Sequence, residues 1–358
     1  MVACFISHYL HLCRYFLFIA TFLFSAALDA QTIRIGVSGP FTGGSSPMGE
    51  SMRNGVRLAV EEINGAGGIN GMSIELVERD DTANNETGAK IADELTRSKV
   101  AATIGIVNTG VGLASIDYYQ KAKIPLLVAV STGPMLTRKF SPPSQKANFI
   151  FRVSPTLDLE ARVLAADLKR KSLLRIALMA DTTPYGDSGV SAFAEQARLA
   201  GLDIVAELRF KVGDTDMSGL VKRARASGAA AVVMWGIGPE LASIARGMHS
   251  VGWRVPILGS WTLSMRNFID AAGPAGDGAL MPQTFIQDAG STTKNSFLLA
   301  YHRAFRTDLI PSPMSAAQGY DGMHLLAHAI RQSTTWDGDA IRNSLENLNF
   351  RYQGVVTS

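Results

Sequence analysis

The sequence predicts an α/β protein made of two doubly wound, Rossmann-like lobes. Residues 33–37 form an apolar run, residues 52–63 repeat apolar side chains at the spacing of one buried helix face, and residues 74–77 form a second apolar run. The glycine-rich residues 64–71 end the helix, because glycine adopts the left-handed conformation common at helix C-termini. We expect this strand–helix–strand unit to have a parallel, right-handed crossover.

Strands and helices continue to alternate along the chain in two series. In the first series the pattern predicts strands at residues 101–106, 125–130 and 149–153 and helices at residues 84–98 and 110–120. In the second it predicts helices at residues 157–171, 187–200, 217–227 and 239–251, followed in turn by strands at residues 175–180, 203–210, 230–235 and 256–258. An extended segment at 278–285, helices at 292–306, 314–332 and 337–348, and the start of one more strand at 350–358 complete the prediction. Two such series predict two lobes, each with its own sheet.

Length and composition agree with a large α/β protein. The chain has 358 residues, 47% of them hydrophobic, which is enough for about two domains with substantial cores. The net charge of +3 is close to neutral, and the short basic clusters at residues 169–171 and 222–225 are typical of solvated helix ends. The composition therefore argues against nucleic-acid binding.

Residues 1–30 are predicted to be a signal peptide. Residues 16–28 are almost wholly apolar, follow Arg14 and end in small residues, which is the pattern of a cleaved export signal. A permanent membrane anchor is the alternative, but this segment is short for the ~20 apolar residues of a membrane span. Both cysteines, Cys4 and Cys13, lie in it. We therefore expect the mature chain to contain no disulfide and no cysteine-based site.

Polar residues follow several of the predicted strands. In open parallel sheets, ligands bind beyond the carboxyl ends of the strands, and two facing lobes would enclose a small molecule. Thr109, Ser131 and Thr132 lie in two neighbouring loops of this kind, each next to a glycine. Hydroxyls and backbone N–H groups near helix N-termini suit a carboxylate, and a role as helix caps alone is the alternative that the sequence leaves open.

Aromatic residues follow strands of the second series. Tyr185, Trp235 and Trp261 lie at predicted strand ends. Aromatic rings in such positions either cover the apolar part of a ligand or belong to the core. The pattern leaves both roles open.

Three further motifs have ordinary structural explanations. The glycines of residues 36–44 lack the spacing of a dinucleotide-binding loop. The Gly-Asp-Ser-Gly run at residues 186–189 matches a protease nucleophile motif, but no base or orienting acid can be placed beside it, so Asp187 and Ser188 are predicted to cap a helix. His324 and His328 lie one helical turn apart without an evident third metal ligand. We expect neither a metal nor a cofactor.

The opening unit carries a resemblance to a known family. Residues 59–71 read A-x-E-x-I-N-x-x-G-G-I-x-G, and the likeness continues through residues 80–82, 131–134, 185–186 and 320–321. On these residues the chain resembles the branched-chain amino acid (Leu/Ile/Val)-type substrate-binding proteins of ABC importers over nearly all of residues 32–358. These proteins have the type I periplasmic binding fold.

The resemblance implies a set of ligand-binding residues. The ligand carboxylate would be held in the first lobe, and an aromatic residue of the second lobe, Tyr185, would cover the ligand. The first-lobe positions are Thr109, Val130, Ser131 and Thr132. The lobes would close by bending at three hinge crossings, residues 151–155, 278–285 and 350–357.

The chain departs from the family pattern at Trp261. The amino acid receptors hold the α-ammonium with a glutamate in this loop, where this chain has Trp261. Since a buried ammonium without a partner is costly, we expect a ligand with a carboxylate and no α-amine, stacked on Trp261. A cation–π contact between Trp261 and an ammonium is the alternative.

These observations predict the organisation and function of the chain. The domains expected are a signal peptide at 1–30, lobe 1 at 31–152 and 284–335, and lobe 2 at 153–283 and 336–358, with a truncated C-terminal part. The predicted function is that of an exported, periplasmic and monomeric solute-binding protein that captures an amino acid or organic acid for a membrane permease. A ligand sensor of the same fold is the first alternative, and an enzyme is the second.

Overall fold

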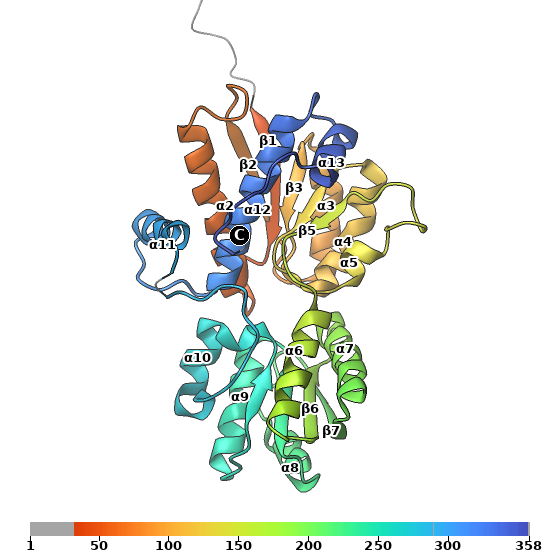
Figure 1. Cartoon of the computed structure of the whole chain (residues 1–358), viewed down its shortest axis with the longest axis vertical. Coiled ribbons are helices and arrows are strands. Elements are labelled where there is room, and N and C mark those ends of the chain that lie inside the picture. Colours follow the sequence, from red (N-terminus) through yellow and green to blue (C-terminus); the bar gives the residue numbers. More distant parts are fainter. Residues whose placement is uncertain (1–31, 289, 357–358) are drawn as a thin grey trace, which may run out of the picture. The chain divides into compact units, whose positions relative to one another are not determined.

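The computed structural model describes residues 32–288 and 290–356, so the predicted signal peptide lies outside the described residues. Within them, five parallel strands form one sheet in the order β2-β1-β3-β4-β5, and four parallel strands form another in the order β7-β6-β8-β9 (Figure 1). The strands of the first sheet are β1 (Ile33–Gly39), β2 (Ile74–Asp80), β3 (Ala102–Gly105), β4 (Leu126–Val128) and β5 (Ile150–Arg152). Those of the second are β6 (Arg175–Asp181), β7 (Asp203–Phe210), β8 (Ala231–Trp235) and β9 (Ile257–Gly259). The predicted fold class is confirmed.

The first lobe consists of the five-stranded sheet and the helices packed on it. These are α2 (Ser46–Gly65), α3 (Asn85–Arg97), α4 (Thr109–Ala122), α5 (Met135–Arg138), α11 (Thr292–Phe305), α12 (Pro313–Gln332) and α13 (Gly338–Glu346). Alternate strand residues point to opposite faces of the sheet. Ile35 and Ile104 pack with α2 and α12, whereas Leu126 and Val128 pack with α3 and α4. Each face thus has its own buried apolar cluster.

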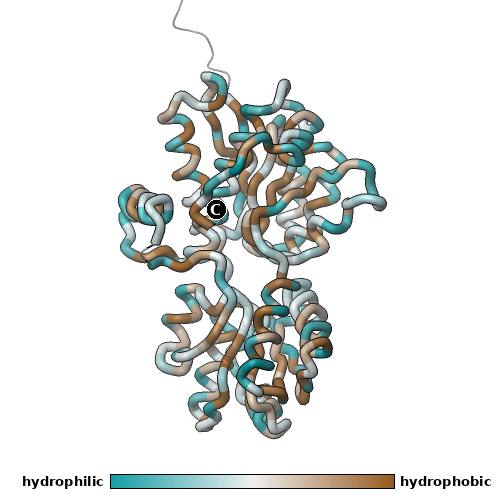
Figure 2. Tube along the Cα trace, viewed as in Figure 1, coloured by the Kyte–Doolittle hydropathy of each residue, from teal (hydrophilic) through white to brown (hydrophobic). Residues whose placement is uncertain are grey.

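The second lobe follows the same plan. Its helices are α6 (Leu157–Arg170), α7 (Pro184–Ala200), α8 (Ser218–Ala226), α9 (Gly238–Ser250) and α10 (Arg266–Ala272), with short 3-10 turns η1 (Trp261–Ser264) and η2 (Gly273–Gly276). Leu178 and Val233 pack with α6 and α7, and Met179 and Val232 pack with α8, α9 and α10. The inner strands β1, β3, β6 and β8 are buried along most of their length, as expected of parallel sheets covered on both faces, and Figure 2 shows hydrophobic segments inside both lobes.

Strand order fixes where a ligand site can form. β1 lies between β2 and β3, and β6 lies between β7 and β8, so the winding of each sheet reverses beside its first strand. In doubly wound sheets the crevice at this reversal, outside the carboxyl ends of the strands, is where ligands bind. Both sheets therefore offer a site at the same end of their strands.

The C-terminal elements differ from the predicted domain boundaries. Residues 336–358 were expected in the second lobe, but Ile341 of α13 is buried in the first-lobe cluster, and Lys123 of α4 pairs with Asp339. The described residues after 349 form no strand. Instead, the carboxylate of Asp321 on α12 accepts hydrogen bonds from the backbone N–H groups of Val355 and Val356 and from the hydroxyl of Tyr352. A side chain thus takes the place of the expected strand partner.

The start of α7 also differs from the prediction. The helix begins at Pro184, and Thr183 is its cap, so the assignment of Asp187 and Ser188 as caps was wrong. Proline is favoured in the first turn of a helix, where its missing N–H is not needed. Of the described helices, none is both long and apolar enough to cross a membrane.

Candidate ligand-binding site

A cavity of about 600 Å³ lies where segments that follow the strands of both sheets meet. Its first-lobe wall consists of Ser45, Met48, Ala83, Asn84, Asn85, Glu86, Val107, Asn108, Thr109, Gly110, Ser131 and Thr132. Its second-lobe wall consists of Thr182, Thr183, Pro184, Tyr185, Val212, Ile237, Trp261 and Thr262. This volume is within the usual range for pockets that hold small molecules.

Several helices begin at the cavity. In the first-lobe wall, α2 starts beside Ser45 and α4 starts at Thr109, and neither helix has a side-chain cap. The first N–H groups of a helix have no partner within the helix, and the helix dipole makes this end electropositive. The start of α3, in contrast, is capped by Asn84, which accepts a hydrogen bond from the Thr87 N–H. The uncapped starts of α2 and α4 therefore suit an anionic group.

The hydroxyls predicted from the sequence come together at the start of α4. The Thr109 and Ser131 hydroxyl oxygens are 3.0 Å apart, and the exposed fractions of these residues are 3% and 1%. Gly133 leaves room for Thr109 here, since a Cβ at this position would lie 2.5 Å from the Thr109 Cγ2 atom. Val130, also predicted, is absent from the wall and packs in the first-lobe apolar cluster.

Thr132 lies beside a buried carboxyl group that the sequence analysis did not identify. Glu160 of α6 is 4% exposed, and its Oε2 accepts a hydrogen bond from the Trp261 backbone N–H at 3.2 Å. Burial raises the pKa of Glu160 to about 7, while the Trp261 N–H and the nearby Thr132 hydroxyl act in the opposite direction. A carboxyl group that links residues of both walls therefore titrates near neutrality.

Trp261 is a wall residue and a core residue at the same time. Its side chain is 4% exposed and packs in the cluster that contains Phe41, Met48 and Val130 of the first lobe. The indole Nε1–H is buried, and no described residue accepts a hydrogen bond from it. Trp261 thus combines an apolar surface with one unused donor. Trp235, the other predicted tryptophan, is fully buried against Phe193 and does not reach the cavity.

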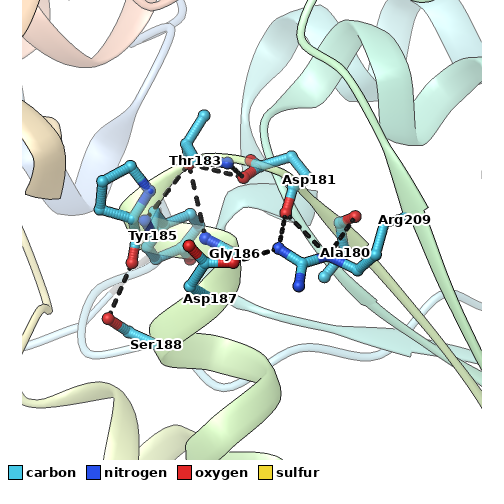
Figure 3. A network of polar contacts seen from close by, with 9 residues as sticks. Ala180, Asp181, Thr183, Tyr185, Gly186, Asp187, Ser188 and Arg209 are labelled. Atoms are coloured by element: carbon cyan, nitrogen blue, oxygen red, sulfur yellow. Dashed lines mark hydrogen bonds and ion pairs between the residues drawn. The ribbon is translucent and has the colours of Figure 1, made fainter.

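A polar network fixes Tyr185 at the start of α7 (Figure 3). The Thr183 hydroxyl accepts hydrogen bonds from the N–H groups of Tyr185 and Gly186 and donates to the Asp181 carboxylate. Arg209 of β7 bonds to the Asp181 carbonyl and to the Asp187 carboxylate. Burial, followed by the neighbouring Glu160, raises the pKa of the Tyr185 hydroxyl. The phenol therefore stays neutral, and its ring is presented by a rigid turn.

The structure adds site residues that sequence patterns did not single out. These are mainly amides and hydroxyls of the first-lobe wall: Ser45, Asn84, Asn85 and Asn108. Glu160 does not line the cavity but bonds to the wall residue Trp261. Asn108 donates a hydrogen bond to Ser45, which joins the starts of α2 and α4. The signal was available for Asn84 and Asn108, because Asn84 is the first residue of one predicted helix and Asn108 lies two residues before another. For Glu160 there was none, since it reads as one charge on an amphipathic helix.

The two histidines considered as metal ligands have other contacts. His324 lies 3.4 Å from the Glu62 carboxylate and packs against Tyr320, while His328 packs against Phe350. Burial lowers the pKa of both imidazoles. Among the described residues, no group of three or more histidine, cysteine, aspartate or glutamate side chains could hold a metal ion.

Comparisons with known proteins agree with this architecture. A family model described as periplasmic binding protein matches residues 32–357. The Leu/Ile/Val-binding protein homolog 3 of Brucella melitensis is 27% identical over 332 residues, which cover 92% of this chain and 87% of that protein. A periplasmic binding protein type 1 from Bordetella pertussis superposes with a TM-score of 0.84 at 27% identity, covering 92% of this chain and 91% of that one. The branched-chain amino acid transporter substrate-binding protein LivJ from Streptococcus pneumoniae, solved with isoleucine, superposes with a TM-score of 0.81 at 25% identity, covering 91% of each chain.

Proposed function

The chain belongs to the periplasmic binding protein family, and we propose that it is the solute-binding protein of an ABC importer that captures an amino acid or another small carboxylate between its two lobes. The observation that carries this proposal is the cavity of about 600 Å³ whose walls come from both lobes. A ligand that contacts both walls stabilises the closed arrangement relative to the open one, because only the closed form makes both sets of contacts. Ligand binding and closure of the lobes are therefore coupled.

The walls suggest how such a ligand is oriented. In our proposal its carboxylate lies at the start of α4, against the hydroxyls of Thr109 and Ser131 and the backbone at Thr132. The rings of Tyr185 and Trp261 cover its apolar part. Buried hydroxyl and N–H donors bind a carboxylate well because charge-assisted hydrogen bonds are the stronger class.

The same proposal covers partners and location. Of the relatives given above, one is named a Leu/Ile/Val-binding protein homolog and another is a branched-chain amino acid transporter substrate-binding protein solved with isoleucine. We propose that this chain is exported through residues 1–30, acts as a monomer and delivers its ligand unchanged to a membrane permease. Cell fractionation with N-terminal sequencing tests the export step, and co-purification with a permease tests the partner.

Thermal unfolding with a ligand panel tests the binding function. The chain from Gln31 would be melted with each common L-amino acid, with the matching 2-oxo acids and with aromatic carboxylic acids. A ligand at 100 times its dissociation constant adds about 2.7 kcal/mol to the free energy of unfolding, which is a readily measured shift. Mass spectrometry should recover the bound compound unchanged. A panel without any stabilising compound contradicts the proposal, and conversion of the compound would indicate an enzyme.

A further inference from the structure

One arginine holds the loop that follows β4 from the side away from the cavity. Arg152 of β5 donates hydrogen bonds to the carbonyl oxygens of Ser131, 3.3 Å from Nη1, and of Gly133, 2.6 Å from Nη2. The same guanidinium donates to the Pro155 carbonyl oxygen at 3.3 Å and to the Thr137 hydroxyl at 3.1 Å. Pro155 lies where the chain crosses from β5 of the first lobe to α6 of the second. Arg152 therefore ties this loop to the first crossing between the lobes.

Other residues of the crossing bind the same loop. The Ser154 hydroxyl donates to the Ser131 carbonyl oxygen at 2.7 Å, and the Leu157 N–H donates to that of Thr132 at 2.9 Å. In a trans peptide group the N–H lies opposite the carbonyl, so the N–H groups of Thr132 and Gly133 point away from the crossing. Among the described residues, neither of them donates to a backbone carbonyl. Two backbone donors of the proposed carboxylate site are thus oriented by bonds made on its far side.

The Arg152 guanidinium is a cation without a carboxylate partner. Of the ion pairs that the described residues form, none includes it, and its four hydrogen bonds go to neutral oxygens. The charged groups near it, Arg138 of α5 and Asp158 of α6, pair with each other at 2.8 Å. Burial lowers the pKa of Arg152 to about 10, with Arg138 acting in the same direction and Asp158 against it, so the group is charged at neutral pH.

A positive charge in this place favours an anion on the other side of the loop. Each peptide group is a dipole whose positive end is the N–H. The guanidinium lies at the carbonyl end of the peptide group whose N–H belongs to Thr132, so it adds its field to the positive end that faces away from it. Such a field is screened less in a partly buried site than in water. A ligand carboxylate against Thr109 and Ser131 would therefore be attracted by Arg152 without touching it.

We propose that Arg152 is a positioning residue that makes the cavity selective for an ionised carboxylate, because it orients the N–H donors of the loop at residues 131–133 and supplies a counter-charge from behind them. This inference rests on the proposed function and concerns how the carboxylate end of the ligand is recognised. A carboxamide keeps the shape of a carboxylate and its carbonyl acceptor but carries no charge. It should therefore lose the contribution of Arg152.

Calorimetry on the exported chain tests the inference, with L-leucine and L-leucinamide as the first pair of probes, at pH 6.5, where both amines are protonated. If another L-amino acid stabilises the protein more, it and its amide replace them. Arg152→Gln removes the charge and keeps an amide donor, whereas Arg152→Lys keeps the charge. The control Arg138→Gln removes a neighbouring guanidinium that is exposed and paired with Asp158. Circular dichroism and thermal melts verify folding.

The expected result is a loss of preference for the charged ligand. Arg152→Gln should lower the affinity ratio of leucine to leucinamide by about tenfold or more, while Arg152→Lys should retain most of the ratio and Arg138→Gln all of it. A role confined to the shape of the loop would change both affinities by the same factor. An unchanged ratio in Arg152→Gln, or a ratio that falls as far in Arg152→Lys, overturns the inference and leaves the proposed function standing.

Two measurements keep the test decisive if Arg152→Gln does not fold. Equal affinities of the wild-type protein for leucine and leucinamide, or a preference for leucine that is lost in Arg152→Lys, would overturn the inference. A preference of about tenfold or more that Arg152→Lys retains would support it. Binding of no compound in the ligand panel removes both the inference and the proposed function.

Discussion

The two walls of the cavity differ in the residues that form them and in how their polar groups are paired. The first-lobe wall is polar and mostly paired within itself: Thr109 bonds to Ser131, Asn108 bonds to Ser45, and Asn84 caps α3. Only the Thr132 hydroxyl and the Asn108 amide oxygen lack a partner among the buried side-chain atoms described in this wall. The second-lobe wall presents Tyr185, Ile237 and Trp261, and its unused polar groups are buried behind or within the aromatic residues. The hydroxyls at the start of α4 are thus held in place without a ligand, whereas both aromatic residues of the second wall have a polar atom without a partner.

This difference suggests a division of roles. A wall whose groups already hold each other in place pays little conformational cost when a carboxylate arrives, so it supplies affinity for the part that all candidate ligands share. A wall with unsatisfied groups discriminates, because a ligand that leaves them unpaired loses binding free energy. We expect substitutions in the first wall to weaken all carboxylate ligands alike and substitutions in the second to change which ligand is preferred.

The largest effect is expected at Trp261, where wall and core coincide. Trp261→Ala removes a nearly buried indole from the first-lobe cluster, so the free energy of unfolding should fall by about 3–5 kcal/mol and ligand affinity should fall with it. Trp261→Phe keeps an aromatic surface and removes only the Nε1–H, and it should lose far less stability. Urea unfolding and calorimetry measure both quantities. Equal stability of the alanine variant and the wild type would contradict the packing described here.

The pH dependence of stability tests the burial of Glu160, which does not line the cavity but bonds to the wall residue Trp261. Its pKa is raised from 4.5 to about 7 by burial, so the folded state holds a proton that the unfolded state releases at lower pH. This stabilising contribution is complete below pH 4.5 and is lost as the pH rises through about 7. Relative to Glu160→Gln, the wild type should therefore lose roughly 3 kcal/mol across this range, levelling off above neutrality. Parallel unfolding curves for the two proteins at all pH values would contradict the burial of an ionisable group there.

The paired hydroxyls of the first wall should matter less for stability than for binding. Thr109→Val leaves the Ser131 hydroxyl without its partner and removes one donor from the proposed carboxylate site. A hydrogen bond to a charged group contributes about 1.5–3 kcal/mol, so affinity should fall by roughly tenfold or more for amino acids and 2-oxo acids alike. Ser115→Ala removes another buried hydroxyl from the same helix, one that bonds to Val111 inside it, and affinity should be unaffected. If Thr109→Val lowered the affinity for only one of the two ligand classes, the first wall would also discriminate between ligands, which would contradict the proposed division of roles.

The fold was predictable from the sequence because its signals are local. Apolar runs, helix periodicity and glycine turns indicated both sheets and most helices. Thr109, Ser131, Thr132, Tyr185 and Trp261 were predicted as site residues because they follow strands, and the structure places all five at the cavity. All five lie in segments that follow a predicted strand, and this position can be recognised from the sequence alone.

Most of the features that the sequence did not predict depend on contacts between residues that are far apart in the chain. The partners of Glu160 include Trp261, 101 positions further along the chain, and Asp321 holds a tail more than 30 positions away. Val130 was expected at the site, but its side chain points to the first-lobe core. The start of α7 was missed for another reason: Thr183-Pro184 is a strong cap, and Asp187 and Ser188 drew attention only because they resemble a different motif.

A matched pair of helix caps gives the smallest expected effect and the finest test of the comparison. Asn84 caps α3 in the first wall, and Thr183 caps α7 in the second. Replacing either with alanine removes one capping acceptor, so each variant should lose about 1 kcal/mol of unfolding free energy.

Their effects on binding should differ although their costs in stability are similar. Asn84 lines the same wall as the proposed carboxylate site at the uncapped start of α4, so Asn84→Ala should weaken the binding of all ligands slightly and equally. Thr183 fixes the turn that presents Tyr185, so Thr183→Ala should change the order of preference among ligands of different side-chain size. Calorimetry with L-alanine, L-leucine and L-phenylalanine measures that order. If both variants change the affinity for all three ligands by the same factor, the order of preference stays the same. The second wall would then be no more selective than the first, because loosening the turn that holds Tyr185 would affect binding in the same way as loosening the start of α3.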